Sequence, residues 1–390
     1  MGSVHVIGAG MTKFGHLEES IIDLARNASL RALEDAQASG EKIDHILVAS
    51  QNPDEFTGIG HLSTLMADSL GIVPAGGTRI ESGPSSGASA VEAGFAMIRS
   101  GLAELVLVVG MEKMSEVSRE RASAILAKMI SKENEARYGA TPASLAALIA
   151  RRYMHDYGLT RDELSLVPVK AHRNGARNPL AHFQKEITVE KVNASPIVSS
   201  PLTLFDCCPT SDGAASVVLA SAEKARKLGV IGDSATFKGI GHATDFLAVQ
   251  HRESLTSLSA TVNAARDAFR MAKTRPEDID VFELHDAFSI LEIIDIEDMG
   301  LAKQGKGIEI IKSGDVEVDG KIPINTTGGL KARGHPTGAT GVAQIRDIFL
   351  QLTNRAPGSL QVPNAHRGLT HNIGGFGNNM IVTIFESNSI

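Results

Sequence analysis

The sequence predicts an α/β protein with two similar lobes and a helical region inserted into the first. Short runs rich in Val and Ile alternate with longer segments at helical spacing, a pattern typical of a mostly parallel sheet covered by helices. The same order of strands and helices recurs in the second half, without a repeat of fixed period. The 390 residues, 43% of them hydrophobic, are enough for two to three domains.

Each element is predicted from its apolar pattern. In the first lobe this pattern predicts strands over 4–7, 45–49, 78–81 and 105–109, and helices over 21–37 and 85–100. Further along, it predicts strands over 212–220, 235–241, 281–284 and 380–385, and helices over 255–273 and 338–352. The first lobe is therefore expected to comprise 1–112 with 199–233, and the second 234–390.

Between the two parts of the first lobe, residues 113–198 are rich in Met and in charge. Thr141-Pro142 is a typical helix start, and Thr160-Arg-Asp-Glu163 matches a capping box. We expect an inserted helical loop domain. Its basic residues, which either face the phosphates of a ligand or form a solvated helix face, are Arg151, Arg152, Lys170 and Arg173.

Composition argues against several classes of function. The formal net charge of −7 gives no basic footprint for nucleic acid, and no run of about 18 apolar residues or signal-type N-terminus is present. The cysteines, Cys207 and Cys208, are adjacent and match no zinc spacing. We therefore expect a cytoplasmic protein without a metal site, in which both cysteines are small buried residues.

Two histidines occupy positions suited to chemistry. His335 lies between glycines directly before a predicted helix, which exposes the imidazole and allows a substrate to approach. His285 lies at the end of a predicted strand, where α/β folds bind their ligands. The alternative for His335 is an incidental histidine in a Gly-Pro turn. The alternative for His285 is a hydrogen-bonded structural histidine.

Two further segments offer backbone N–H groups. The helix that begins near Ser85 and Ser86 has tiny side chains, so either its N-terminus receives an anionic group or it crosses the centre of a packed domain. Gly374 and Gly375 precede the final strand, where they either serve an oxyanion or form a hairpin turn.

Taken in order, separated segments of the chain resemble the thiolase superfamily over nearly the whole length. These segments are 174–183, 201–209, 211–215, 283–288, 334–341 and 371–377. The His-Asp-x-Phe pattern beginning at His285 resembles the sterol-carrier-protein-like and archaeal thiolases. The resemblance implies two similar mixed-sheet α/β lobes in a layered αβαβα fold. It also implies an acyl-CoA ligand, with coenzyme A as a substrate and no tightly bound cofactor.

The resemblance also implies roles for individual residues. His335 matches the histidine that activates the nucleophile and polarises the thioester carbonyl, and His285 matches a residue of the first oxyanion hole. Gly375, with the backbone N–H at Ser85, matches the second oxyanion hole. The residues expected to contact the substrate are Gly374, Gly338 and Phe288.

The sequence lacks cysteines at the positions where the family pattern has them. Counting back three residues from Gly87, as the family's C-x-x-G motif requires, leads to Pro84 instead of cysteine. The family's second cysteine corresponds to Ile373, and the one found in the sterol-carrier-protein branch to Ala287. Ser85 or Ser86 is then the candidate nucleophile, although a serine ester is less reactive toward a carbanion than a thioester is.

Three functions remain open. The first is an acyltransferase of the acetyl-CoA C-acetyltransferase type, acting on acetyl-CoA or a 3-oxoacyl-CoA. The second is a non-catalytic acyl-CoA-binding subunit in a complex with a hydroxymethylglutaryl-CoA synthase and a zinc-ribbon and OB-fold protein. The third is a condensing enzyme or acyltransferase that holds an enolate between its histidines without covalent attachment. The resemblance also implies a homodimer formed through the first lobe, or a dimer of dimers.

Overall fold

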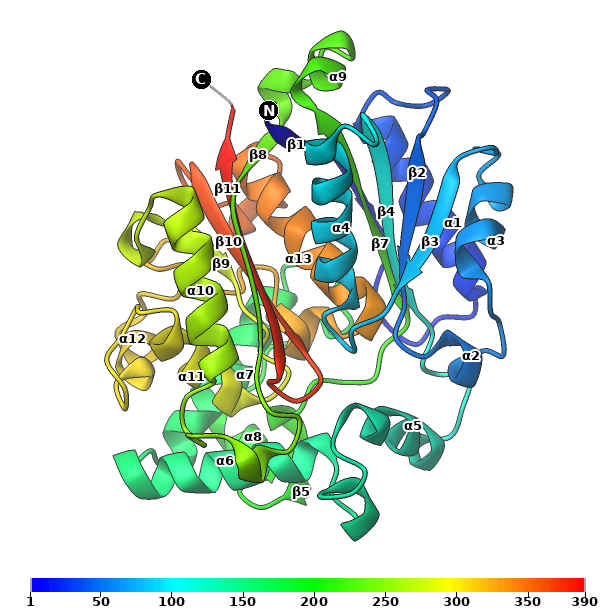
Figure 1. Cartoon of the computed structure of the whole chain (residues 1–390). Coiled ribbons are helices and arrows are strands. Elements are labelled where there is room, and N and C mark those ends of the chain that lie inside the picture. Colours follow the sequence, from blue (N-terminus) through cyan, green and yellow to red (C-terminus); the bar gives the residue numbers. More distant parts are fainter. Residues whose placement is uncertain (1, 389–390) are drawn as a thin grey trace.

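The computed structural model describes residues 2–388, which form a nine-stranded sheet accompanied by helices (Figure 1). The spatial order of the strands is β3-β2-β4-β7-β1-β8-β11-β10-β9. Their bounds are β1 Val4–Met11, β2 His45–Ala49, β3 Gly76–Ile80, β4 Leu105–Glu112, β7 Gly213–Ser221, β8 Ala235–Thr244, β9 Val281–Glu283, β10 Arg367–Gly374 and β11 Asn379–Ser387. The two halves of the sheet join where β1 pairs with β8, at His5 with Thr236 and at Val6 with Ala235.

The strand directions are mixed, which confirms the mixed-sheet lobes that the resemblance implied, whereas the apolar runs by themselves indicated a mostly parallel sheet. β2 is parallel to β3 and β4, and β9 is parallel to β10. The other pairings in this sheet are antiparallel. Every residue of β4 is buried, because helices cover both of its faces. Such a strand carries a continuous apolar run whatever the direction of its neighbours, so the run does not reveal the direction.

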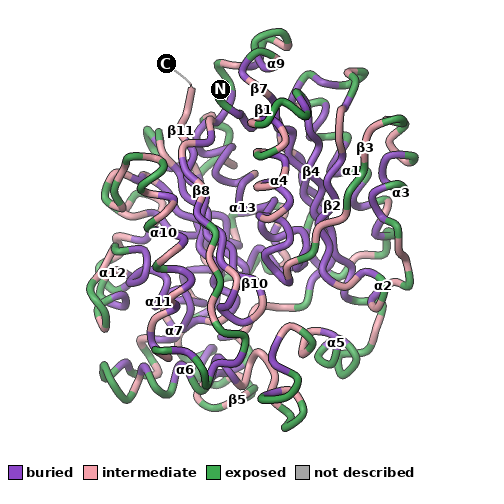
Figure 2. Tube along the Cα trace, viewed as in Figure 1, coloured by how far each residue is buried: buried purple, intermediate pink, exposed green. Residues whose placement is uncertain are grey.

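Helices and half-sheets stack in the five layers α, β, α, β, α. α1 (Ile21–Asp35) packs on β1 and β7, and α10 (Ser259–Ala272) packs on β8 and β11. α4 (Ser86–Ser100) and α13 (Thr337–Leu352) contact each other between the two half-sheets. Figure 2 shows this central region as mostly buried. The predicted layered α/β fold is confirmed.

The central helices approach closely because each of them has a glycine where they cross. A Cβ atom on Gly87 of α4 would lie 2.8 Å from the backbone nitrogen of Val342 and 3.0 Å from Cα of Gly341, both in α13. Real Cβ atoms are not found at such distances from backbone atoms without a shift. The small residues of α4 therefore allow this helix to cross the centre of a packed domain. This was one of the two interpretations of the segment.

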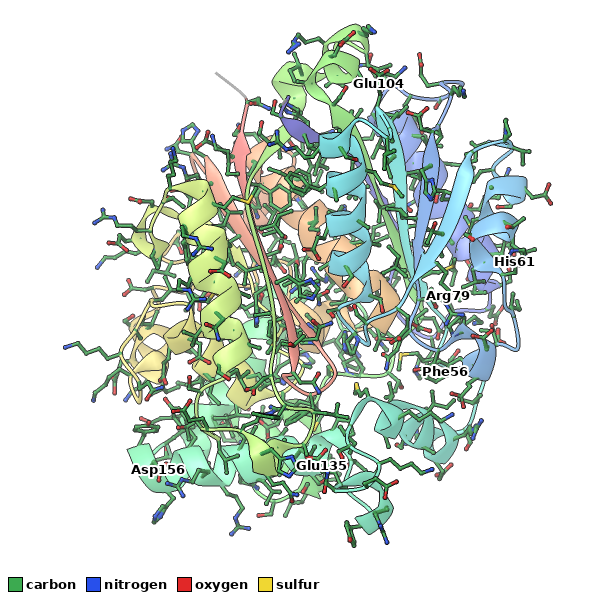
Figure 3. All side chains as sticks on the ribbon, viewed as in Figure 1. Phe56, His61, Arg79, Glu104, Glu135 and Asp156 are labelled. Carbon is green, nitrogen blue, oxygen red and sulfur yellow. The ribbon has the colours of Figure 1, made fainter. Side chains whose placement is uncertain are left out.

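The inserted segment folds over one end of the lobes. Its elements are α5 Arg119–Leu126, α6 Pro142–Tyr157, α7 Arg161–Gly175, α8 Val189–Asn193, β5 Ile197–Ser199 and β6 Leu202–Thr203. Both predicted helix starts are confirmed, since Thr141 caps α6 and Thr160 forms a capping box with Glu163 at α7. Glu135 accepts hydrogen bonds from the backbone of Ser131 and Val249, which ties the insertion to the segment after β8 (Figure 3).

Several elements differ from their prediction. The segment 371–377, for which no strand was predicted, is a strand up to Gly374, and its remaining glycines lie in the turn between β10 and β11. The helices that were not predicted are α2 Pro53–Phe56, α3 Leu62–Ser69, α9 Ala222–Lys227, α11 Ser289–Asp298 and α12 Gly307–Ser313. Within residues 2–388, every helix is too short or too polar to cross a membrane.

Replacing Gly87 with alanine is expected to destabilise the protein. The new methyl group would press on the backbone of α13, and overpacking of this kind costs about 1–3 kcal/mol, more than the alanine adds in helix propensity. Thermal or urea unfolding measures the change. Gly232→Ala is the control, because a Cβ there meets nothing within 4 Å. Equal stability of the two variants would contradict the close crossing.

Candidate active site

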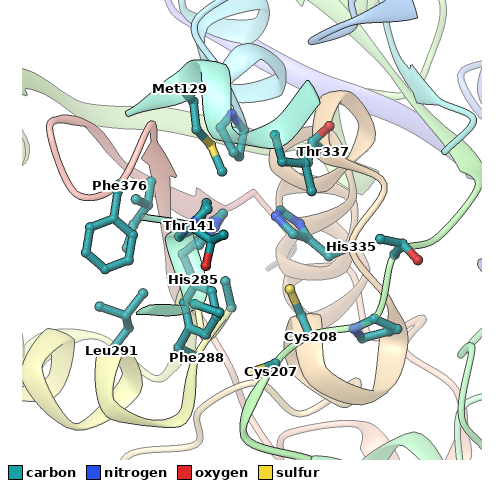
Figure 4. A pocket seen from close by; sticks show the side chains of 18 of the residues that line it. Met129, Thr141, Cys207, Cys208, His285, Phe288, Leu291, His335, Thr337 and Phe376 are labelled. Carbon is teal, nitrogen blue, oxygen red and sulfur yellow. The ribbon is translucent and has the colours of Figure 1, made fainter. Parts of the chain in front are cut away.

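A cavity of about 440 Å³ lies where the two lobes and the insertion meet (Figure 4). Pro84 from the first lobe, Met129 and Thr141 from the insertion, and His285 and His335 from the second lobe all line it. Among the described residues that line the cavity, none is Lys, Arg, Asp or Glu. The cavity is therefore a neutral and mostly apolar compartment, in which polar interactions with a ligand are strong.

His335 is held at the start of α13 with one ring nitrogen free. Its backbone N–H donates to Oγ of Ser211 at 3.1 Å, and its Nδ1 lies 2.7 Å from Oγ1 of Thr340. The Thr340 hydroxyl donates its single proton to the carbonyl oxygen of Pro336, at 2.9 Å. Thr340 therefore accepts from His335, so Nδ1 carries the proton and Nε2 keeps its lone pair.

The surroundings keep the His335 imidazole neutral. Burial, reinforced by the positive charge of Arg333, lowers the pKa of His335 to about 3. A group with this pKa is unprotonated at neutral pH. Nε2 is thus in the form that accepts a proton.

His285 has the complementary arrangement. It follows β9, and its Nδ1 lies 3.0 Å from the amide nitrogen of Asn372 in β10. An amide nitrogen donates, so Nδ1 accepts and the proton of His285 is on Nε2. Burial, followed by the nearby His335, His371 and Arg333, lowers the pKa of His285 well below its usual value. The two rings meet edge to face, with centroids 5.0 Å apart. Nε2 of His285 can therefore donate a hydrogen bond to a ligand, whereas Nε2 of His335 can accept one.

A buried carboxylate fixes the start of α13. Glu112, at the end of β4, accepts hydrogen bonds from the side chain of Thr337 and the backbone N–H of Gly338, both at 3.0 Å. It also accepts from the chain just after β2, including the backbone N–H of Gln51 at 2.7 Å. Burial raises the pKa of Glu112, and these hydrogen bonds oppose the shift. The position of His335 thus depends on a carboxylate from the other lobe.

The glycines expected at the site have different surroundings. Gly375, with φ of +60°, lines the cavity in the turn after β10, where this conformation favours glycine. A Cβ on Gly374 would lie 2.3 Å from Oγ of Ser85, and one on Gly338 would lie 2.5 Å from the carbonyl oxygen of Met111. Gly374 and Gly338 therefore allow close packing behind the wall, whereas Phe288 lines the cavity.

The two candidate serines point their hydroxyls at the backbone. Ser85 donates to the carbonyl oxygen of Ser82 at 2.8 Å, and Ser86 donates to that of Gly83 at 2.5 Å. Both residues are fully buried, and neither is among the residues that line the cavity. Serine hydroxyls at a helix start commonly bond to nearby carbonyls in this way. The neighbouring Pro84 faces the cavity instead.

The resemblance implies a thiol at three positions, and all three of these positions line the cavity. Pro84, Ile373 and Ala287 each contribute to its wall. Cys207 and Cys208 were expected to be small buried residues, but both are only half-buried, because they line the same cavity. Reasoning from the sequence missed these two, because their separation from the histidine segments along the chain gave no sign of proximity.

Reasoning from the sequence also missed the residues that hydrogen-bond to the two histidines. Thr340 lies five residues after His335 and therefore near it at the start of the same helix, which was a usable signal. Asn372 reaches His285 from a neighbouring strand, and the sequence carries no comparable signal for that pairing. Asp286, which belongs to the His-Asp-x-Phe pattern, accepts from the backbone of Leu330 at 2.6 Å and is not part of the cavity wall.

The basic residues of the insertion are mostly engaged in ion pairs. Lys170 is buried against Glu292 and is therefore unsuited to binding an external phosphate. Arg173 pairs with Glu317, and Arg152 with Asp156. Within residues 2–388, no cluster of three or more His, Cys, Asp or Glu residues is arranged to hold a metal ion.

These features define a two-lobed, five-layered α/β protein with a histidine pair in a neutral cavity between its lobes. The chain belongs to the thiolase superfamily. The model of the thiolase N-terminal domain matches residues 4–223, and the thiolase C-terminal domain-like model matches residues 241–387. The predicted family is confirmed.

Named relatives and a solved structure cover nearly the whole chain. An acetyl-CoA acetyltransferase of Methanothermobacter thermautotrophicus is 43% identical over 99% of this chain and 100% of its own length. Sterol carrier protein 2 of Oryctolagus cuniculus is 33% identical over 98% of this chain and 72% of its own length. The structure of an Ltp2-ChsH2(DUF35) aldolase superposes with a TM-score of 0.85 at 25% identity, covering 99% of this chain and 98% of that one.

The ring protons of His335 can be observed directly. With ¹⁵N-labelled histidine, NMR is expected to show Nδ1 of His335 protonated and Nε2 unprotonated from pH 8 down to about pH 5, because the pKa of about 3 lies below this range. Thr340→Val removes the acceptor and is expected to give a mixture of tautomers, whereas Thr340→Ser keeps it. A mixture in the unaltered protein would contradict the assigned hydrogen bond.

Proposed function

We propose that the chain makes or breaks a carbon–carbon bond beside the carbonyl of an acyl-CoA thioester, without a covalent acyl-enzyme. One observation carries this proposal. Pro84 occupies the cavity wall at the position of the family's nucleophile, and the hydroxyls of Ser85 and Ser86 are bonded to backbone carbonyls outside the wall. A proline side chain has no nucleophilic atom, and its nitrogen has no proton to donate to an oxyanion.

The histidine pair suits an aldol-type reaction. In the cleavage direction, Nε2 of His335 removes the proton from the 3-hydroxyl group of a 3-hydroxyacyl-CoA. The C2–C3 bond then breaks, C3 becomes an aldehyde or ketone, and the electron pair passes to the thioester as an enolate. The Nε2–H of His285 donates to the enolate oxygen, where charge develops. Protonation of C2 completes a shorter acyl-CoA, so no oxidant, water or second coenzyme A is consumed.

The comparisons support the substrate class and the type of reaction separately. The relative that is 43% identical is named for acetyl-CoA, which favours a CoA thioester as ligand. The structure superposing with a TM-score of 0.85 is described as an aldolase, which favours cleavage beside the carbonyl. Coenzyme A is then part of the substrate, consistent with a neutral cavity that receives the thioester while the phosphates stay outside.

Acetyl transfer of the acetyl-CoA C-acetyltransferase type is the second candidate, and the identity of 43% favours it. It requires an acyl-enzyme on Ser85 or Ser86 and hence a rotation of that hydroxyl into the cavity. Its signature is cleavage of acetoacetyl-CoA that depends on added coenzyme A. A test for this dependence on coenzyme A therefore separates the two candidate functions.

The protein is expected to cleave 3-hydroxy-3-phenylpropanoyl-CoA to benzaldehyde and acetyl-CoA, which chromatography detects. His335→Ala is expected to lower the rate about 10²- to 10⁴-fold, because it removes the general base. Ser85→Ala and Ser86→Ala serve as matched controls and are expected to retain activity. Intact-mass measurement should show no acyl adduct. An adduct on either serine, together with cleavage of acetoacetyl-CoA that requires coenzyme A, would overturn the proposal in favour of acetyl transfer.

We also propose that the chain works within an assembly. The structure of the aldolase is described as containing a second component, ChsH2(DUF35). A zinc-ribbon and OB-fold protein is the class of partner that the sequence resemblance implied, with a hydroxymethylglutaryl-CoA synthase as a further partner. β3 is an edge strand of the first lobe, which leaves one side of its backbone open to pairing in a homodimer.

Coexpression with a zinc-ribbon and OB-fold protein from the same genome is expected to give one complex in size-exclusion chromatography with light scattering. The mass should correspond to two copies of this chain plus its partner. Separate elution of the two proteins, with undiminished aldol cleavage by this chain alone, would contradict a required partner.

A further inference from the structure

The backbone holds Cys208 between the two histidine segments. On one side, Cys207 forms a bridge with Phe288, and the N–H of Cys208 donates to the carbonyl oxygen of Ala287 at 2.8 Å. On the other side, Thr210 forms a bridge with His335. Cys208 is therefore within two residues of a contact with each histidine-bearing segment. In Figure 4 its sulfur points toward the side of the cavity where the His335 ring lies.

The two adjacent cysteines differ in the hydrogen bonding of their thiol groups. Sγ of Cys207 lies 3.7 Å from the carbonyl oxygen of Thr203, to which it donates. Among the hydrogen bonds of residues 2–388, Sγ of Cys208 takes part in none, although it lines the cavity. Burial raises the pKa of Cys208 to about 12. A thiol with this pKa stays protonated at neutral pH, so it is a proton donor and a poor nucleophile.

The proposed reaction needs a proton at C2 of the enolate. Of the hydroxyl groups in the wall, that of Thr337 donates to Glu112. A thiol is a stronger acid than an alcohol, so Cys208 is the better donor among groups of this kind. His335 receives the proton of the 3-hydroxyl group and is occupied at the moment when the enolate forms.

We propose that Cys208 is a catalytic residue whose thiol delivers a proton to C2 of the thioester enolate. This inference rests on the proposed function. In the cleavage direction the S–H bond breaks, a C–H bond forms at C2, and the thiolate then recovers a proton from Nε2 of the His335 imidazolium. In the reverse direction His335 takes the thiol proton while the sulfur removes one from C2. Protons balance in both directions.

Exchange of the C2 protons tests Cys208 without any carbon–carbon cleavage. Acetyl-CoA is incubated with the protein in D₂O, and mass spectrometry follows deuterium in its acetyl group. Cys208→Ala is expected to slow the exchange about 10²-fold or more, the usual contribution of a general acid or base. Cys208→Ser is expected to remain slow, because an alcohol is the weaker acid. Leu204→Ala is the control, because this exposed residue of the same segment lies outside the cavity wall, and it should exchange at the rate of the unaltered protein.

Affinity for acetyl-CoA and thermal unfolding are measured for each variant, and both are expected to stay unchanged in Cys208→Ala. Exchange within twofold of the unaltered rate in Cys208→Ala would overturn the proposal, because His335 would then transfer both protons. An unaltered protein that does not exchange the C2 protons would overturn it as well. Exchange that depends on Cys208, without cleavage of 3-hydroxyacyl-CoA, would uphold Cys208 and refute the proposed function.

Discussion

The close crossing of α4 and α13 is the constraint on which the site depends. Gly87 lets the backbones of the two helices meet, and the starts of both helices consequently reach the same cavity. Pro84 precedes one helix and His335 precedes the other. Glu112 then ties the start of α13 to the ends of β2 and β4. The geometry of the cavity is thus a product of packing between the lobes and of these hydrogen bonds.

Within this frame, each histidine derives its role from a neutral partner. Thr340 takes the Nδ1 proton of His335, and Asn372 donates to Nδ1 of His285. The cavity has no charged side chain among its described lining residues, so burial keeps both rings uncharged. An acceptor and a donor therefore lie side by side, as the proposed enolate chemistry requires.

Much of the fold and part of the site could be predicted from the sequence. The capping residues of α6 and α7 act locally, so the chain carries their signal, and His335 and His285 stand at recognisable strand and helix ends. The resemblance implied mixed sheets, but the apolar pattern alone did not reveal the strand directions, because a strand buried on both faces has no alternation of polar and apolar residues. The direction of the Ser85 hydroxyl and the proximity of Cys208 to the histidines arise from tertiary contacts, for which one sequence has no local signal.

The wall of the cavity draws on three regions of the chain that are far apart in sequence. No single lobe contains the two histidines, Pro84 and Met129 together, so the cavity is complete only when the lobes and the insertion have docked. Selection for packing at the helix crossing and selection for chemistry consequently act on the same contacts. A chain in which the lobes and the insertion had not yet docked would therefore lack the cavity altogether.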